Sequence, residues 1–109
     1  MTALPEDIAA LKRVKERLAT PDQWTKRAMA RNSRGHETGW AEPDAVCWCL
    51  YGAGEREHCS PLAYAALGSV LDEWVGHKRI ADWQDRLDRT LEDVHELIDR
   101  AIERMEAST

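Results

Sequence analysis

Hydrophobic residues recur every three or four positions in several stretches of the chain, which is the spacing of one face of an α-helix. This pattern predicts four main helices, near residues 5–19, 43–53, 60–75 and 90–106. The last of them has the most regular pattern. Its expected buried face consists of Leu91, Val94, Leu97, Ile98, Ala101, Ile102 and Met105. We therefore predict a single, mostly α-helical domain.

Residues that favour helix ends support some of these boundaries. Ser60 followed by Pro61 predicts an N-cap and a proline at the first helical position, and Gly76 is a suitable end for the same helix. The stretch 90–93 resembles a capping box at the start of the last helix. Between these two helices, residues 80–83 are expected to form a short extended link.

The predicted helix 43–53 is apolar around most of its circumference, so we expect it to lie at the centre of the fold. Val46 and Cys49 are expected on its buried face. Gly52 and Gly54 occupy positions typical of a helix end or of a close approach by another element.

Residues 23–31 fit either a helix or a strand, and the turn sequence at 32–35 favours a small β-hairpin near residues 25–40. The chain has five tryptophans, which we expect to pack mainly in the core. Trp40 has a second interpretation, because it follows a glycine on a predicted loop. It would then be exposed and contribute, with Arg31 and Arg34, to a surface that binds a partner.

Composition limits the classes of protein that remain. The 109 residues suffice for one compact domain, 1–109, and two tyrosines and the tryptophans supply bulk in the absence of phenylalanine. No run approaches the ~18 apolar residues of a membrane span, and the N-terminal residues do not resemble a signal peptide. Three cysteines are too sparse for a disulfide scaffold, so we expect reduced thiols and a cytoplasmic protein.

Charge is unevenly distributed along the sequence. Residues 1–40 carry a balance of +3 and residues 41–109 a balance of −8, which together give the net charge of −5. An acidic chain is a poor general binder of phosphate, so a nucleic-acid partner is disfavoured. We expect the two segments to attract each other, or to bias how copies of the chain approach, which leaves a homo-oligomer possible. The basic residues that would contact a nucleic acid are Lys12, Arg13, Lys26, Arg27, Arg31 and Arg34.

The cysteines and one histidine are the first candidates for chemistry, since Cys47, Cys49, His58 and Cys59 could form a zinc site. Residues two apart on a helix point about 200° from each other, so the first two cysteines could not share one ion there. We expect buried thiols instead, with no metal and no cofactor. Cys59 precedes a helix start and is expected to be the most reactive thiol.

No nucleophile with an adjacent base stands out in the sequence, but carboxylates gather around the segment from Trp83 to Asp85. They leave open a small enzyme or a cation-binding domain as the alternative to a non-enzymatic module. A non-enzymatic interaction or regulatory module that binds another protein is the interpretation we prefer.

A set of motif residues carries a family resemblance over roughly residues 8–104. The set comprises Trp24, Trp48, Cys49, Gly52, Ala53, Trp83 and Asp85. The chain resembles a small bacterial and bacteriophage domain family of unknown function, with a Trp-Cys-Leu-x-Gly-Ala core and a Trp-Asn-Asp element before the last helix. This sequence has Gln84 where that family often has asparagine, and Tyr51 where leucine is common. The resemblance implies no activity, cofactor or catalytic residue, and we expect the motif to serve folding.

Overall fold

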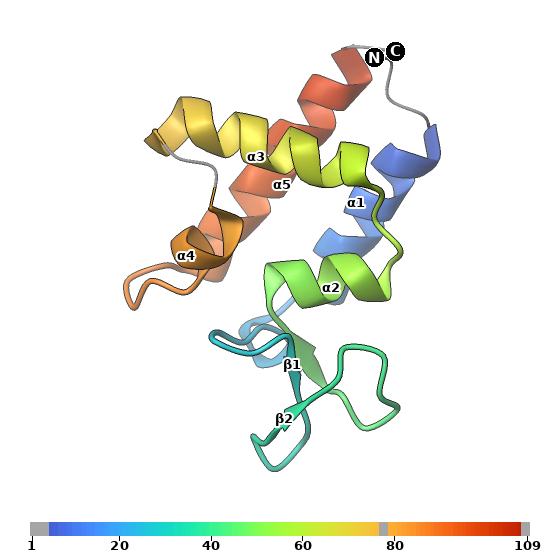
Figure 1. Ribbon diagram of the computed structural model, residues 1–109, viewed down its shortest axis with the longest axis vertical. Helices are drawn as coiled ribbons and strands as arrows, with labels where there is room; N and C mark the ends of the chain where they lie inside the picture. The colour runs from blue at the N-terminus through green and yellow to red at the C-terminus, as the bar shows by residue number, and fades with distance from the viewer. Residues whose placement is uncertain (1–4, 77–78, 108–109) are drawn as a thin grey trace.

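Five α-helices make up most of residues 5–76 and 79–107, which are the residues that the computed structural model describes (Figure 1). The mostly helical fold is confirmed, and a small three-stranded antiparallel sheet accompanies it. None of the helices in the described residues is long and apolar enough to span a bilayer. The helices are α1 (Pro5–Arg17), α2 (Leu50–Arg56), α3 (Pro61–Val75), α4 (Ile80–Gln84) and α5 (Leu91–Ala107), with a 3₁₀ turn η1 (Pro21–Gln23).

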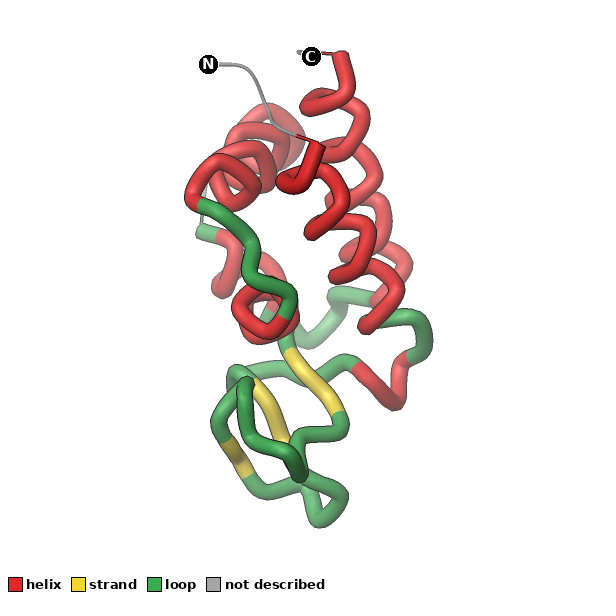
Figure 2. Tube along the Cα trace, turned by 90° about the vertical axis from the view of Figure 1, so that its right-hand side faces the viewer, coloured by secondary structure: helices red, strands yellow, loops and turns green. Residues whose placement is uncertain are grey.

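The longer helices pack together at one end of the molecule, and the strands and their loops occupy the other end (Figure 2). Helix α5 packs against both α3 and α1, and the core lies between these three helices and α2. The buried face predicted for α5 is confirmed at every position. The largest fully buried apolar side chains are Trp83, Leu11, Leu18, Leu50, Leu67, Leu71, Leu97 and Ile98.

The predicted boundaries of α3 are also confirmed. The Ser60 hydroxyl accepts a hydrogen bond from the Ala63 backbone N–H at 3.2 Å, and Pro61 begins the helix. Gly76 forms the C-cap. Ser60 also donates a hydrogen bond of 2.5 Å to the buried carboxylate of Asp7, which ties the start of α3 to α1.

The predicted hairpin is present as two short strands, β1 (Ala30–Arg31) and β2 (Glu37–Thr38), joined by the expected turn. The side-chain carboxamide oxygen of Asn32 accepts hydrogen bonds from the backbone N–H groups of Arg34 and His36, at 3.0 and 3.1 Å. A third strand, β3 (Cys47–Trp48), pairs with the other side of β1, so the sheet order is β2-β1-β3.

The prediction of a helix over 43–53 is wrong for its first half, because α2 begins only at Leu50. The residues before it pair with the hairpin. The Val46 N–H donates to the Arg31 carbonyl at 2.9 Å, and the Cys49 N–H donates to the Met29 carbonyl at 3.2 Å. These bonds replace the ones that a helix would have formed, and they leave Val46 46% exposed.

The expected extended link at 80–83 is also wrong, since this segment forms α4. The Trp83 N–H donates to the Arg79 carbonyl and the Asp85 N–H to the Ala81 carbonyl, at 3.0 and 2.9 Å. The short helix places Trp83 and Gln84 in the interior, where each is 1% exposed.

The expected attraction between the basic N-terminal segment and the acidic remainder is confirmed in the helical layer. Lys15 pairs with Asp99 at 2.8 Å, while Arg13 and Arg17 both pair with Glu57, at 3.2 and 2.5 Å. Exposed pairs add little stability each, but these cross between helices that are distant in sequence. They therefore help to orient α1 on α2 and α5.

Gly52 marks a close approach, as its sequence position indicates. A Cβ atom at this position would overlap the carbonyl oxygen of Met29, in the segment that leads into β1. Helix α2 can therefore begin against this backbone only if residue 52 has no side chain.

We predict that Gly52→Ala destabilises the protein by about 2–3 kcal/mol, because the added methyl group must displace backbone and not a flexible side chain. Urea unfolding followed by circular dichroism measures this change. Gly39→Ala is the matched control and should cost no more than about 0.5 kcal/mol, since the new methyl group meets only the flexible side chain of Glu42. Equal stability of the two variants would contradict the close approach.

Candidate functional site

The buried side chain of Gln84 connects three separate parts of the fold. Its Oε1 atom accepts a hydrogen bond from the indole Nε1 of Trp24 at 2.7 Å and another from the backbone N–H of Leu50 at 2.7 Å. Its Nε2 atom donates to Oδ1 of Asp85 at 2.6 Å. Buried polar groups require such partners, so this carboxamide fixes η1, the start of α2 and α4 relative to one another.

Asp85 extends this network to the segment before β1. Its Oδ1 atom also accepts a hydrogen bond from the Arg27 backbone N–H at 3.0 Å. Arg27 has φ of +63°, a left-handed conformation that is uncommon for a residue with a side chain. The bond to Asp85 holds the backbone in this conformation, so the carboxylate shapes the turn at residues 26–29.

The ammonium group of Lys26 fastens the same turn to the loop between α4 and α5. Its Nζ atom donates to the carbonyl oxygens of Arg86, Leu87 and Arg89, the latter two at 3.3 and 2.9 Å, and it also lies 5.1 Å from the centre of the Trp24 ring. The ammonium group of Lys26 is thus engaged by groups of the protein itself.

A groove lies between α2, α4 and the turn at 26–29. Its inner part is a cavity of about 240 Å³. This inner cavity is lined by Ala28, Met29, Cys49, Tyr51, Ile80, Ala81, Gln84 and Asp85. A shallower hollow of about 480 Å³ continues from it past Tyr51 and α4 to Arg79 and Asp82. We refer to the inner cavity and this hollow together as the α2–α4 groove.

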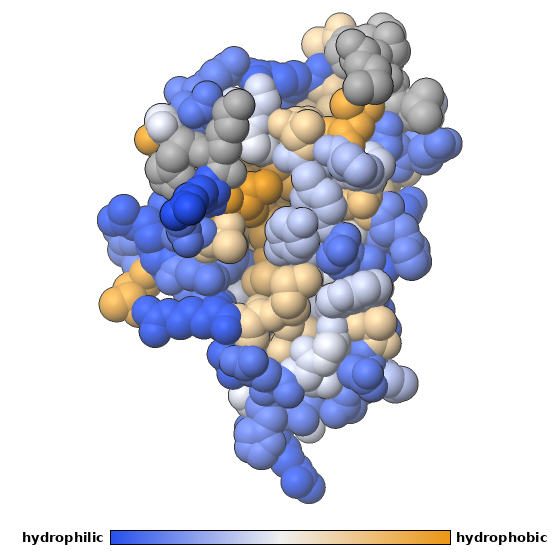
Figure 3. All heavy atoms as spheres, viewed as in Figure 1, coloured by the Kyte–Doolittle hydropathy of each residue, from blue (hydrophilic) through white to orange (hydrophobic). Residues whose placement is uncertain are grey.

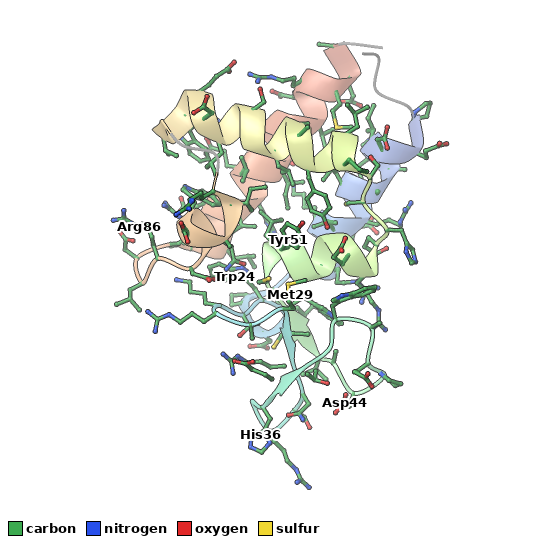
Figure 4. The ribbon with its side chains drawn as sticks, viewed as in Figure 1. Trp24, Met29, His36, Asp44, Tyr51 and Arg86 are labelled. Atoms are coloured by element: carbon green, nitrogen blue, oxygen red, sulfur yellow. The ribbon has the colours of Figure 1, made fainter. Side chains whose placement is uncertain are left out.

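The groove opens on the face seen in Figures 3 and 4. Figure 4 shows Trp24, Met29 and Tyr51 close together near the start of α2, facing α4, whereas His36 and Asp44 lie towards the far end of the hairpin and its neighbouring loop. In Figure 3, apolar colouring gathers along the middle of this face, with hydrophilic residues on both sides. The lining of the groove combines apolar residues such as Met29 and Ile80 with the charged residues Arg79, Asp82 and Asp85.

Cys49 lies in the wall of the inner cavity and caps α2. Its Sγ atom accepts a hydrogen bond from the Gly52 backbone N–H at 3.2 Å. Burial raises the pKa of the Cys49 thiol; backbone hydrogen bonds, chiefly that from Gly52, oppose this, and the charge of Asp85 raises the pKa further. The thiol is thus mainly protonated at neutral pH, and the negative charge of Asp85 contributes to this.

Three of the motif residues, Trp24, Trp83 and Asp85, are bonded to Gln84 or adjacent to it in sequence. Trp24 bonds to it directly, and Trp48 lies beside Trp24 through a bridge between their backbones. Cys49, Gly52 and the buried Ala53 form the first turns of α2, while Trp83 and Asp85 flank Gln84 in sequence. The side chains of Gln84 and Asp85 accept hydrogen bonds from the backbone N–H groups of Leu50 and Arg27, which lie far from them in sequence.

The other residues of the groove do not stand out in the sequence. Met29 and Ile80 carry no chemical signal in the sequence, and Ile80 was assigned to a link. Gln84 was noted only as a departure from the family pattern. A sequence feature that points to Gln84 is its position beside a tryptophan in a short apolar segment, because a carboxamide buried there needs hydrogen-bond partners.

The three residues suggested for partner binding have different surroundings. Trp40 is half-buried against the core, as expected for most of the tryptophans and not as its second interpretation required, and its carbonyl accepts hydrogen bonds from Trp48 Nε1 and Arg56. The guanidinium of Arg31 donates to Thr25 Oγ1 and to two backbone carbonyls. Arg34 is exposed at the hairpin turn.

The cysteines are free thiols, on β3, at the start of α2 and in the loop before α3. Within residues 5–76 and 79–107, no three His, Cys, Asp or Glu side chains gather to hold a metal. The expectation that Cys59 is the most reactive thiol is wrong. Cys59 packs into the core, and burial raises its pKa to about 11 although the charge of Arg13 opposes the shift.

Three of the carboxylates near Trp83 form separate ion pairs. Asp82 pairs with Arg79 at 3.3 Å, Asp88 with Arg86 at 3.2 Å, and Asp93 with Arg89 at 3.7 Å. An arginine that pairs with a carboxylate competes with a bound cation, so these three carboxylates do not favour the alternative of a cation site.

The chain belongs to a family of unknown function, DUF6197, whose family model matches residues 3–104. The resemblance to a family without an assigned function is thereby confirmed. Neither the curated proteins nor the solved structures include a significant match.

We predict that Gln84→Leu destabilises the protein by about 3 kcal/mol. Leucine has a similar size but no acceptor, so the Leu50 N–H and the Trp24 indole N–H lose their partner in the interior. Urea unfolding gives the free energy, and the indole resonance of Trp24 in a ¹⁵N–¹H spectrum should shift. Gln23→Leu is the matched control and should cost about 1 kcal/mol or less, since its hydrogen bonds to Thr20 are exposed. Equal costs for both variants would refute the role of Gln84.

We predict that Cys59 is the slowest thiol to react with iodoacetamide in the folded protein. A pKa of about 11 leaves roughly a hundredfold less reactive thiolate at neutral pH than an ordinary cysteine has, and burial slows access further. Its alkylation rate should rise with pH up to about 11. Peptide mass spectrometry after timed alkylation identifies each site, and urea-unfolded protein is the control. Fast labelling of Cys59 at pH 7 would contradict this assignment.

Proposed function

We propose that this DUF6197 member is a non-enzymatic binding module and that the α2–α4 groove is where it binds another protein. The observation that carries the proposal is the exposed apolar wall of a groove whose shape is fixed from within. Tyr51 is 40% exposed and stacks on Tyr64, with ring centroids 4.7 Å apart. Exposed aromatic residues beside an apolar cavity are typical of protein-binding surfaces.

Rigidity supports the proposal. The three walls of the groove are joined by the hydrogen bonds of Gln84 and Asp85, and Lys26 fixes the loop that follows α4. A partner that binds a preformed groove does not have to order it first, so more of the contact energy appears as affinity.

Charge supports a protein over a nucleic acid as the partner. Of the six basic residues considered for nucleic-acid contact, Lys12 and Arg13 pair with Glu106 and Glu57, and Lys26 and Arg31 bond to groups of the protein itself. Arg27 and Arg34 are separate exposed positions in the turn and the hairpin. A phosphate backbone needs a denser positive surface than this.

We further propose a bacterial or phage origin and a cytoplasmic location for this module. The family resemblance of the sequence supports the first. The free thiols of Cys47, Cys49 and Cys59 are compatible with the reducing conditions of the second.

A photocrosslinking experiment tests the groove. A photoreactive benzoyl-phenylalanine in place of Tyr51 keeps an aromatic ring in the wall. On irradiation in cells of the source organism, it should give a discrete adduct with a different protein. Adding Ala81→Phe, which fills the groove, should reduce this adduct at least fivefold, because the partner can no longer enter.

The matched control is Ala65→Phe, an equal increase in size on the exposed side of α3, outside the residues that line the groove. It should leave the adduct unchanged. Equal adducts from the Ala81 and Ala65 variants, or an adduct with only a second copy of the chain, would contradict the proposal.

A further inference from the structure

Asp85 presents a carboxylate to the inner cavity with only one of its oxygens engaged. Oδ1 accepts both internal hydrogen bonds, from the Arg27 N–H and from Gln84 Nε2. Across residues 5–76 and 79–107, the structure gives Oδ2 no hydrogen-bond partner and Asp85 no ion pair. A carboxylate in this state retains the capacity to accept a further, charge-assisted hydrogen bond.

The remainder of the cavity wall suits an aliphatic chain. Ala28, Met29, Ile80 and Ala81 contribute hydrocarbon, and the volume is about 240 Å³. This lies below the ~300 Å³ at which pockets for drug-sized ligands begin, so the cavity matches a single long side chain better than a cofactor. Lysine and arginine have the required build, with an apolar stem and a cationic head.

The charges around the groove leave Asp85 without a counter-ion. Arg79 borders the outer hollow, but its guanidinium pairs with Asp82. The ammonium of Lys26 is engaged by the carbonyls of the loop at 86–89, and Arg27 meets Asp85 through its backbone. The lining therefore contains two carboxylates and one guanidinium, which favours a cationic occupant.

We propose that the inner cavity binds an arginine or lysine side chain of the partner protein, with the cationic head on Asp85 Oδ2 and the stem against Met29 and Ile80. This inference rests on the proposed function, because it names the chemistry by which the α2–α4 groove recognises a protein. The groove would then select partners that present a basic residue within an apolar contact surface.

Side-chain analogues test the cavity without knowledge of the partner. Butylammonium and butylguanidinium reproduce the ends of lysine and arginine, while butanol and butyrate are the neutral and anionic analogues. Titration of the ¹⁵N-labelled protein should give saturable shifts at the Arg27 N–H with both cations. Butanol should bind at least tenfold more weakly, and butyrate should not bind. Equal binding of butanol and the cations, or no shift with either cation, would overturn the inference.

Asp85→Asn separates charge from structure. Asparagine keeps an oxygen for the Arg27 N–H and for Gln84 Nε2, but it removes the negative charge and places an N–H₂ group at the position of Oδ2. Binding of both cations should fall at least tenfold. Asp82→Asn removes a carboxylate from the same groove that already has a partner, and binding should stay within twofold of the wild type. A similar loss in both variants would refute the specific role of Asp85.

The same variants distinguish this inference from the proposed function. A crosslinked adduct that Ala81→Phe abolishes but Asp85→Asn leaves unchanged would keep the groove as a protein-binding site and refute the cationic cavity. If the cations bind in a way that depends on Asp85, but no crosslinked adduct is lost in the Ala81→Phe variant, the cation-binding cavity is supported and the proposed protein partner is refuted. Loss of the adduct in both variants supports both.

Discussion

Two hydrogen bonds to one buried oxygen connect the helical layer to the sheet of this fold. Gln84 Oε1 accepts from the Trp24 indole, which lies just before the sheet, and from the first backbone N–H of α2. A buried donor without an acceptor lowers the stability of the folded state by about 1–3 kcal/mol, so moving either N–H group away from Gln84 would destabilise the protein. Helix α4 has only five residues and little stability of its own. Its position therefore depends on the hydrogen bonds of Gln84 and on the packing of the buried Trp83 side chain.

The groove inherits its shape from this arrangement. Gln84 and Asp85 lie at the end of α4, which forms one wall of the groove. Gln84 accepts a hydrogen bond from the Leu50 N–H in the α2 wall, and Asp85 accepts one from the Arg27 N–H in the wall formed by the turn. The left-handed φ of Arg27 would relax if the carboxylate did not hold it. Residues that stabilise the fold and residues that shape the groove are thus the same, so the motif can serve folding and still define a binding surface.

Helical periodicity predicts α3 and α5 well because each is long enough to repeat its apolar positions several times. It fails at Val46 to Cys49, where a short apolar run fits a helix and a strand equally, and backbone bonds to Arg31 and Met29 decide between them. Helix α4 is too short to show a period. The groove is likewise only partly predictable from the sequence. The family resemblance identifies Trp83 and Asp85 as motif residues, but only the folded chain shows which distant backbone N–H groups bond to this segment.

Charge connects the fold to the proposed recognition. The basic residues of α1 are paired with carboxylates of later segments, and Lys26 donates to carbonyl groups, so part of the positive charge of the N-terminal third is engaged within the molecule. Exposed pairs contribute little to stability. The field outside the protein depends on the charge of the whole chain, which has a net value of −5. That field attracts positively charged partners over about one Debye length, ~8–10 Å at physiological salt, whereas the unpaired oxygen of Asp85 acts only on contact. Attraction at long range and selection at short range then favour the same chemistry, a basic side chain carried on an apolar surface.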